Sequence, residues 1–420
     1  MNRRTASAAT TLALGALVLS ACSTKAASEQ SGKSGDVKTD IGVSDSEITL
    51  GVQTDASGIF KAAGLGITHG DEIWADEVNA AGGICGRKIN LDIVDIAYKA
   101  ENAVPTYQTQ KTKVLGLLQV IGAPAMAALK AQVTSDKVLT TASSPSSVNL
   151  DSPSILMIGT TYDVEMINGW NYLAKTGKIH DGDTVGHIYI DSEYGQNGLL
   201  GTKAYAKDHD LKVVEAPLAG TDTDLTATIT KLKSEGVKAI AITTAPAAAG
   251  SAAIQMKTQD LNIPLLASAA SFAPSLLKDD TAATALSDLA TVMNSNAPYS
   301  ADLPAAKKIR DAYAAKGFTD EPSTYVPYGY TAGKVWEGIL TRACDDGDLT
   351  RQGILDAKSK VTGLQTDGLT GDLDYSVPGA PATRESFVLG VDKSAEGGLK
   401  IIEDKSAAEE AKKYKAPYQK

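Results

Sequence analysis

The chain has 420 residues, of which 43% are hydrophobic and 21% charged, and its formal net charge is −10. A body of this length exceeds one ordinary hydrophobic core and suits two lobes. The acidic balance, without a basic cluster, argues against nucleic acid as a partner.

The N-terminus carries a targeting signal. Arg3 and Arg4 precede an apolar run over residues 12–19, which is shorter than the roughly 18 residues that a membrane-spanning helix needs. This pattern predicts a signal peptide over residues 1–21. The run ends in LSAC, which resembles the bacterial lipobox, so we expect Cys22 to be lipidated. Residues 22–45 are rich in Ser, Gly and Lys and are expected to tether an extracytoplasmic body to the outer face of the bacterial cell membrane.

Strand and helix patterns alternate through the first part of the body. Alternating apolar and polar residues predict strands over 47–54 and 88–96. Between them, helical spacing predicts a helix over 66–80 that ends at Gly82-Gly83. The elements expected next are a helix over 103–113, a strand over 115–122, a helix from Pro124 and a strand over 138–144.

The same succession restarts near residue 185. Strands are expected over 185–191, 211–217, 238–245 and 263–269, and helices over 198–208, 225–235 and 247–259. Strands rich in Val, Ile and Leu that alternate with helices are typical of parallel sheets covered on both faces. We therefore predict an α/β fold with two Rossmann-like lobes, in which ligands bind beyond the carboxyl ends of the strands.

The sequence contains no recognisable catalytic or metal-binding motif. It has no Walker loop, no H-E-x-x-H and no G-x-S-x-G, and the segment 64–70 misses the dinucleotide-binding spacing by one residue. The four histidines stand far apart along the chain. We expect no catalytic residue, no metal and no cofactor; a secreted hydrolase with a spatially assembled triad is the disfavoured alternative.

Two cysteines remain after Cys22 is assigned to the lipid. In an oxidising compartment, Cys85 and Cys344 are expected to form a disulfide. Two separate buried thiols are the alternative.

Residues 47–95 resemble the opening of the branched-chain amino-acid-binding protein family, the type I solute-binding lipoproteins of ABC importers. The shared features are Ser57-Gly58 after the first strand, VNAAGGI at 78–84 and Gly86-Arg87-Lys88. A second match is DSEYGQNG at 191–198, which is similar to the family's D-x-x-Y-G turn. The order of elements agrees to about Lys393.

The resemblance implies a type I periplasmic binding protein fold, with two lobes joined by three hinge crossings near 159–161, 293–296 and 373–375. The first lobe is expected to comprise residues 46–160 and 295–374, and the second lobe 161–294 and 375–402. Residues 403–420 are expected to form a charged, solvated tail. Both Cys85 and Cys344 then fall in the first lobe, which favours their pairing.

The family's turns indicate nine candidate ligand-binding residues. The turn after the third strand offers only the backbone N–H groups of Gly122 and Ala123 at a helix N-terminus. The remaining candidates are Ser57, Phe60, Ser143, Ser144, Tyr194, Thr244 and Ser268, of which Tyr194 matches the tyrosine that closes over the ligand. Alternatively, Phe60 and Tyr194 serve packing, and the two serines merely form a turn.

One departure from the family bears on the ligand. Family members that bind amino acids place an acidic residue in the turn that reads ASAAS here, at 267–271. A buried, unpaired ammonium costs several kcal/mol. We therefore expect a small carboxylate, an amide or an aromatic acid in preference to an α-amino acid, unless another acid reaches the site.

The function implied by the resemblance is a lipid-anchored, monomeric receptor of an ABC importer. It would capture a small organic solute (amino acid-like, carboxylate or amide) by hinge closure and dock on permease subunits in the membrane. The tether would keep it near the permease at high effective concentration. The alternative is a ligand-sensing receptor that feeds a signalling partner, because fold does not determine function.

Overall fold

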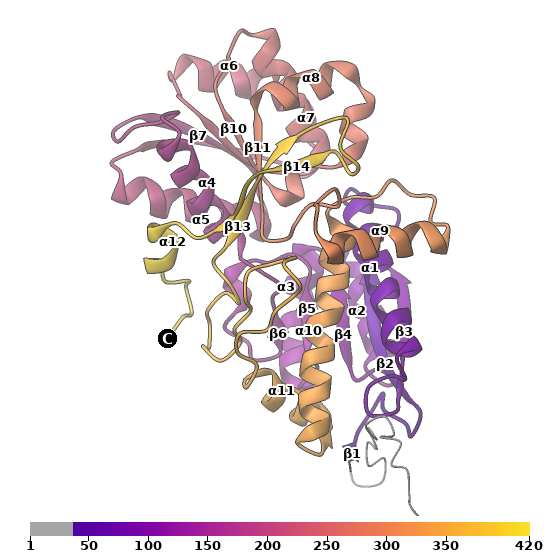
Figure 1. The fold of residues 1–420 in the computed structure, drawn as a ribbon. Coiled ribbons are helices and arrows are strands. Elements are labelled where there is room, and N and C mark those ends of the chain that lie inside the picture. The colour runs from indigo at the N-terminus through magenta and orange to yellow at the C-terminus, as the bar shows by residue number, and fades with distance from the viewer. Residues whose placement is uncertain (1–36) are drawn as a thin grey trace, which may run out of the picture.

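Two β-sheets organise the chain, of which the computed structural model describes residues 37–420. A five-stranded sheet has the order β3-β2-β4-β5-β6, and a seven-stranded sheet has the order β14-β13-β11-β10-β9-β7-β8. Each sheet forms the centre of one lobe (Figure 1). The predicted signal peptide and the lipidated Cys22 lie outside the described residues.

The first lobe is built on the five-stranded sheet, whose strands are all parallel. Right-handed crossovers place α1 on one face of this sheet and α2 and α3 on the other, and α10 packs along α1. The strands are β2 (Glu47–Thr54), β3 (Lys88–Asp95), β4 (Gly116–Val120), β5 (Thr140–Ala142) and β6 (Ile155–Leu156). The helices are α1 (Lys61–Ala80), α2 (Ala100–Gln110), α3 (Ala123–Ser135), α9 (Pro304–Lys316), α10 (Tyr325–Asp345) and α11 (Arg351–Lys358).

The second lobe repeats this arrangement and adds two antiparallel strands at one edge of its sheet. The same crossover rule places α5 on one face and α6, α7 and α8 on the other, and α4 packs beside α5. The strands are β7 (Thr184–Ile190), β8 (Lys212–Leu218), β9 (Ile240–Thr243), β10 (Leu265–Ser268), β11 (Ala290–Asn294), β13 (Ser386–Val391) and β14 (Leu399–Ser406). The helices are α4 (Tyr162–Lys175), α5 (Glu193–Asp208), α6 (Thr226–Ser234), α7 (Pro246–Thr258) and α8 (Asp280–Leu289).

The chain passes between the two sheets three times: between β6 and α4, after β11, and before β13. These passages, together with the parallel-rich sheets, confirm the predicted two-lobed α/β fold. A small two-stranded sheet, β1 (Lys38–Thr39) with β12 (Asp348–Leu349), closes the far end of the first lobe. Cys85 and Cys344 form a disulfide with their Cα atoms 6.4 Å apart, which ties the end of α1 to the end of α10.

Helix α1 begins at Lys61, five residues before the predicted start. Gly64 was expected in the loop before the helix and Gly66 at its first position, but both lie inside the helix, where each meets a close neighbour. A Cβ on Gly64 would lie 2.1 Å from the backbone oxygen of Asp55, and one on Gly66 would lie 2.9 Å from the Cβ of Tyr325. The glycines therefore permit close packing and do not break the helix.

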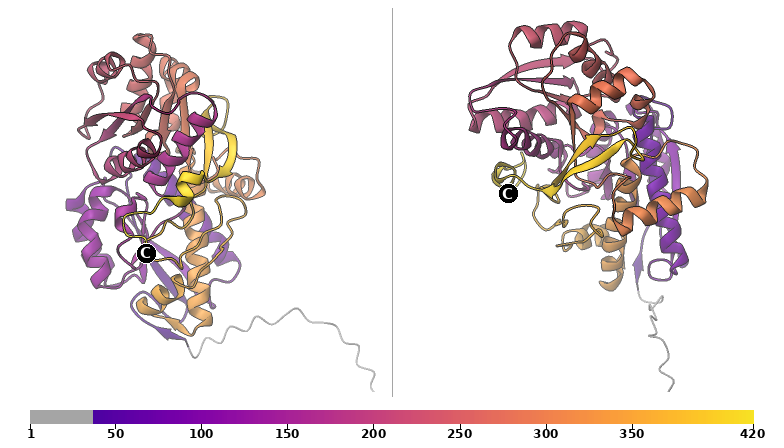
Figure 2. Two further views of the ribbon diagram at one scale, coloured as in Figure 1. Left: turned by 90° about the vertical axis from the view of Figure 1, so that its left-hand side faces the viewer. Right: turned by 45° about the horizontal axis from the view of Figure 1, so that its top comes forward.

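The C-terminal segment differs from the solvated tail that was predicted over 403–420. Strand β14 extends through Ser406, and a short helix, α12 (Glu409–Lys413), packs on α4 with Ala411 fully buried. The Tyr414 hydroxyl donates to Asp163 Oδ2 at 2.8 Å. In Figure 2 this segment runs along the level at which the lobes meet. The many charged residues of this segment led to the prediction of a solvated tail, because composition does not indicate which few side chains are buried.

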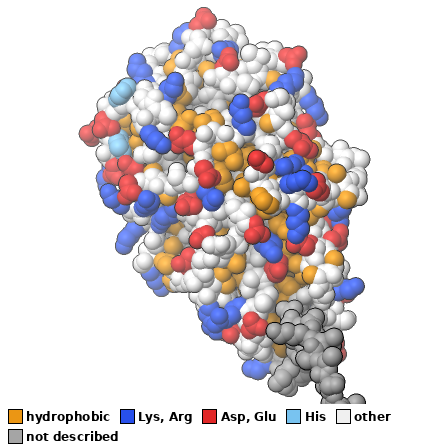
Figure 3. Space-filling view, in the orientation of Figure 1, with side chains coloured by type: hydrophobic (Ala, Val, Ile, Leu, Met, Phe, Trp, Pro, Cys, Tyr) orange, Lys and Arg blue, Asp and Glu red, His pale blue; other side chains and the backbone are white. Residues whose placement is uncertain are grey.

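One face of the molecule is mixed in charge. On the face drawn in Figure 3, acidic and basic side chains are interspersed and do not form a patch of one sign. Within residues 37–420, no helix is both long enough and apolar enough to cross a membrane.

Candidate ligand-binding site

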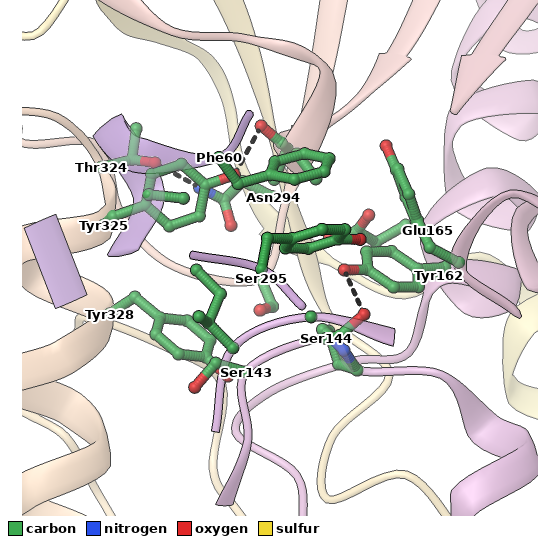
Figure 4. Close-up of a pocket in the computed structure, with 18 residues that line it drawn as sticks. Phe60, Ser143, Ser144, Tyr162, Glu165, Asn294, Ser295, Thr324, Tyr325 and Tyr328 are labelled. Atoms are coloured by element: carbon green, nitrogen blue, oxygen red, sulfur yellow. Dashed lines mark hydrogen bonds between the residues drawn. The ribbon is translucent and has the colours of Figure 1, made fainter. Parts of the chain in front are cut away.

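A cavity of about 50 Å³ lies between the two lobes (Figure 4). The first lobe lines it with the segments that follow β2, β3, β4 and β5 and with the start of α10. The second lobe contributes the starts of α4 and α5, the turn after β10 and the end of β11. The cavity therefore lies beyond the carboxyl ends of the parallel strands, where ligands bind in folds of this kind.

Aromatic rings form much of the wall. The ring centroids of Phe60 and Tyr98 are 4.7 Å apart, and those of Tyr162 and Tyr194 are 4.5 Å apart. Phe60 also meets Tyr194 across the lobes in an edge-to-face contact at 6.4 Å. Helix α10 adds Tyr325 and Tyr328. Such a wall accepts an apolar body, and most of its phenol hydroxyls are held by hydrogen bonds to the protein.

Tyr194 is positioned by groups behind it. Its hydroxyl lies 2.6 Å from Ser268 Oγ and 3.1 Å from Ser271 Oγ, and it donates to the Thr244 backbone oxygen at 3.4 Å. Burial raises the pKa of Tyr194, so the phenol is neutral. Thr244 and Ser268, two of the predicted ligand-binding residues, thus support Tyr194 and do not line the cavity.

Four further candidates line the cavity. They are Phe60, Gly122, Ser143 and Ser144. Gly122 has φ of +102°, and a Cβ there would lie 2.7 Å from the Tyr98 ring, so the position requires glycine. Ser144 Oγ lies 3.4 Å from the Tyr162 hydroxyl, whereas Ser143 Oγ has no hydrogen-bond partner in the described part of the chain.

Two candidates lie outside the cavity lining, Ser57 and Ala123. The Ser57 hydroxyl donates to Asp95 Oδ2 at 2.8 Å and so joins the loop after β2 to the end of β3. Ala123 begins α3 behind Gly122. The structure assigns Ser57 a role in shaping the loop that carries Phe60.

The sequence analysis missed Tyr98, Tyr162, Tyr325 and Tyr328 of the cavity wall, and it also missed an acidic residue that lines the cavity, Glu165. It lies in the first turn of α4, its side chain faces the cavity, and only 3% of its surface is exposed. Its Oε2 atom has no hydrogen-bond partner within residues 37–420. Burial, supported by the nearby charge of Asp163, raises the pKa of Glu165 well above its usual value. An acidic residue in a first helical turn ordinarily signals only a favourable helix dipole, so the sequence offered nothing to single it out.

Glu165 provides an acidic group that could pair with a ligand ammonium. The turn at 267–271 lacks an acid, as the sequence shows, but Glu165 reaches the same cavity from α4. The absence of an acid therefore cannot by itself exclude an α-amino acid. Among the described residues that line the cavity there is no Lys, Arg or His, so a ligand carboxylate would meet hydroxyl, amide and carboxyl side chains and backbone groups, but no cation.

A larger cavity of about 480 Å³ adjoins the first one and shares Phe60, Ala63, Ala270 and Tyr325 with it. Its wall is largely apolar. Ile59, Leu65, Phe272 and Leu276 contribute to it, and Lys61, Lys278, Asp320 and Glu321 lie along it as charged residues. Phe60 and Tyr325 therefore contribute to the walls of both cavities.

Comparisons with known proteins agree with this geometry. A family model described as periplasmic binding protein matches residues 47–397. The chain is 25% identical over 377 residues to the Leu/Ile/Val-binding protein homolog 1 of Brucella abortus (strain 2308), across 85% of this chain and 94% of that protein.

Two solved structures are also similar. The fatty acid ABC transporter substrate-binding protein from Thermomonospora curvata is 35% identical, with a TM-score of 0.87 over 91% of this chain and 97% of that one. A branched chain amino acid ABC transporter structure from Thermus thermophilus with bound valine is 16% identical, with a TM-score of 0.76 over 87% of this chain and 98% of that one. The second likeness concerns the fold alone.

Proposed function

Because the chain belongs to the periplasmic binding protein family, we propose that it is the receptor of an ABC importer, which binds its substrate and does not transform it. It is anchored outside the cell membrane through a lipidated Cys22 and delivers its solute to permease subunits as a monomer. The hinge-moving units are the lobes 46–160 plus 295–374 and 161–294 plus 375–402.

The proposed ligand is a carboxylic acid with an elongated apolar body. The observation that carries this choice is the pair of adjoining cavities: a small inner one with an aromatic wall and a few hydroxyl and carboxyl groups, and a larger outer one whose many apolar side chains are accompanied by Lys61, Lys278, Asp320 and Glu321. The acid group occupies the inner cavity and the apolar chain passes Phe60 toward the outer cavity. The 35% identical relative that is described as a fatty acid ABC transporter substrate-binding protein supports this class.

Contacts across the cleft support capture by closure of the lobes. The Asn197 amide on α5 donates to Ser147 Oγ at 2.8 Å, and Asn197 Oδ1 accepts from the Ser147 backbone N–H at 3.3 Å. On the opposite side, the Tyr325 hydroxyl donates to the Ala269 backbone oxygen at 3.1 Å. Each of these hydrogen bonds joins a residue of one lobe to a residue of the other, so opening of the lobes would break them and closure would form them.

Thermal unfolding with added solutes tests the ligand class. The full chain carrying Cys22→Ser, produced by secretion, would be heated with octanoate, phenylacetate, leucine or glucose. A specific ligand at a hundredfold excess over its Kd stabilises by about 2.7 kcal/mol. We expect octanoate to raise the Tm and glucose to leave it unchanged. A rise with leucine and none with either acid would refute the proposed class.

Cell fractionation tests the anchor. The unaltered chain is expected in the membrane fraction, and the Cys22→Ser variant in the soluble extracytoplasmic fraction, because the acyl chains supply the membrane affinity. Octanoate binding should be the same for both, since the cavity lies in the folded lobes. Membrane retention of the variant would contradict lipidation at Cys22.

A further inference from the structure

Glu165 is enclosed by groups from every element that packs around it. Tyr162 and Asp163 come from its own helix α4, Tyr194 from α5, and Tyr325 and Tyr328 from α10. The backbone N–H of Ala269, after β10, also faces its carboxyl group. No cation is present among these neighbours, and Oε2 is left without a partner in the portion of the chain that the structure describes.

A charged carboxylate is poorly accommodated in such a setting. An ionised group buried without a counter-charge or full hydrogen bonding is strongly disfavoured, and the group then takes up a proton. The raised pKa of Glu165 has this cause, with burial as the larger contribution and Asp163 as a smaller one. A neutral carboxyl group has an O–H that can donate a hydrogen bond to a ligand, which a carboxylate cannot do.

We propose that Glu165 binds the acid head of the ligand, its O–H donating a hydrogen bond to a ligand carboxylate oxygen in a carboxyl–carboxylate pair that shares one proton. The proposal rests on the acid ligand proposed above and specifies how the site recognises it without a cation. The Tyr328 hydroxyl and Ser143 Oγ face each other, and neither has another partner in the described chain, so they are further donors available to the same head group.

The proton in this pair makes binding depend on pH. Two carboxyl groups in contact cannot both ionise, so a bound carboxylate raises the pKa of Glu165 further. At any pH at which free Glu165 is partly ionised, binding takes up a proton, and the affinity falls as pH rises, by at most about tenfold per unit. A ligand ammonium would favour ionised Glu165, release a proton and reverse the sign.

Titration calorimetry with octanoate between pH 5.5 and 8.5 tests the proposal, with the full secreted chain carrying Cys22→Ser. Buffers of different ionisation enthalpy would count the protons exchanged. We expect proton uptake and a Kd that rises with pH. Glu165→Gln keeps the shape and supplies an N–H donor, so it should bind octanoate with a Kd nearly independent of pH and without proton uptake.

The matched control is Asp71→Asn. Asp71 is likewise fully buried, with both oxygens unpartnered in the described residues and a raised pKa, but it does not line the cavity. This variant should retain the pH dependence of the unaltered site. If the affinity rises with pH, or if Glu165→Gln keeps the same dependence of Kd on pH, the proposed role of Glu165 is wrong, while the proposed ligand class still stands. Failure of octanoate to bind at any pH overturns the proposed ligand class, and the inference with it.

Discussion

His187 on β7 shows how burial sets the chemistry of a single side chain. Its ring nitrogens lie 2.8 Å from Thr202 Oγ1 and 2.9 Å from Thr243 Oγ1. Burial, with a smaller effect of Lys203, lowers the pKa of His187 to about 3, against about 6.5 in an unfolded chain. Between these values the unfolded state binds more protons, so this residue makes the fold less stable as pH falls from about 6.5.

Replacement of His187 tests this sign. His187→Gln should be less stable than the native chain at pH 7, because it loses hydrogen bonds and packing. The difference in free energy of unfolding between the native chain and His187→Gln should shrink by up to about 1.4 kcal/mol for each pH unit below 6.5. Urea unfolding at pH 4.5–7.5 measures the slopes, with exposed His180→Gln as the control. Parallel slopes for the native chain and His187→Gln would contradict the assignment.

The contact between α1 and α10 shows how two helices achieve close packing. At Gly329 of α10, a Cβ would lie 2.0 Å from the backbone oxygen of Ile67 on α1, and at Gly70 of α1 it would lie 2.2 Å from that of Val326. Side chains cannot enter such spaces without separating the helices. Helix α10 also carries Tyr325 and Tyr328 into the cavity, so the position of this helix affects the site.

A pair of glycine substitutions in α10 isolates the effect of close approach. Gly329→Ala should destabilise the fold by about 2–4 kcal/mol, because the backbone of α1 cannot yield easily. At Gly338 the added Cβ meets only the Leu364 side chain, at 3.2 Å. Gly338→Ala should therefore be neutral or stabilise by up to about 1 kcal/mol, the helix-propensity gain. If denaturant unfolding shows equal changes in stability for Gly329→Ala and Gly338→Ala, packing between α1 and α10 does not explain the glycine at position 329.

The C-terminal segment connects distant parts of the whole molecule. Beyond the Tyr414–Asp163 hydrogen bond, the Arg384 guanidinium donates to Gln419 Oε1, and the Lys420 backbone N–H donates to the Pro378 oxygen at 3.4 Å. Asp163 lies at the first passage between the lobes, and Pro378 and Arg384 lie within the third. The segment therefore braces the region in which the hinge lies.

Removal of one hydroxyl tests this bracing. Tyr414→Phe should lower the free energy of unfolding by about 1–3 kcal/mol, because the buried Asp163 loses a donor while the ring remains. Tyr418→Phe is the control, since Tyr418 is 47% exposed. If chemical denaturation finds the two variants equally stable, the tail does not contribute through Asp163.

The disulfide acts on the whole first lobe. Cys85 and Cys344 are separated by 259 positions in the sequence, so the cross-link greatly restricts the unfolded chain. Cys85→Ser with Cys344→Ser should cost about 2–5 kcal/mol. Unfolding of the native chain with and without reductant provides the comparison, and reductant should have no effect on the double variant. Equal stability of the oxidised native chain and the double variant would contradict this expectation.

Local patterns in the sequence were sufficient for the architecture. Strand and helix periodicities depend on residues a few positions apart, and they predicted β2, β3 and the repeated β/α units of both lobes. Because parallel strands end at a common edge, the same patterns indicated the turns in which a site would lie. The family resemblance then singled out Phe60, Gly122, Ser143 and Tyr194 in those turns, and all four line the cavity.

Other features depended on contacts between residues far apart in the chain. The burial of Glu165 depends on which face α4 turns toward the cleft after the first passage between the lobes. The support of Tyr194 by Thr244 and Ser268 joins three separate strand ends, and the burial of Ala411 requires the surface of α4. A charge or a hydroxyl in the sequence carries no information about its surroundings. The fold was therefore determined by local periodicity, whereas the chemistry of the site was decided by tertiary packing, which alone removes a carboxyl group from water.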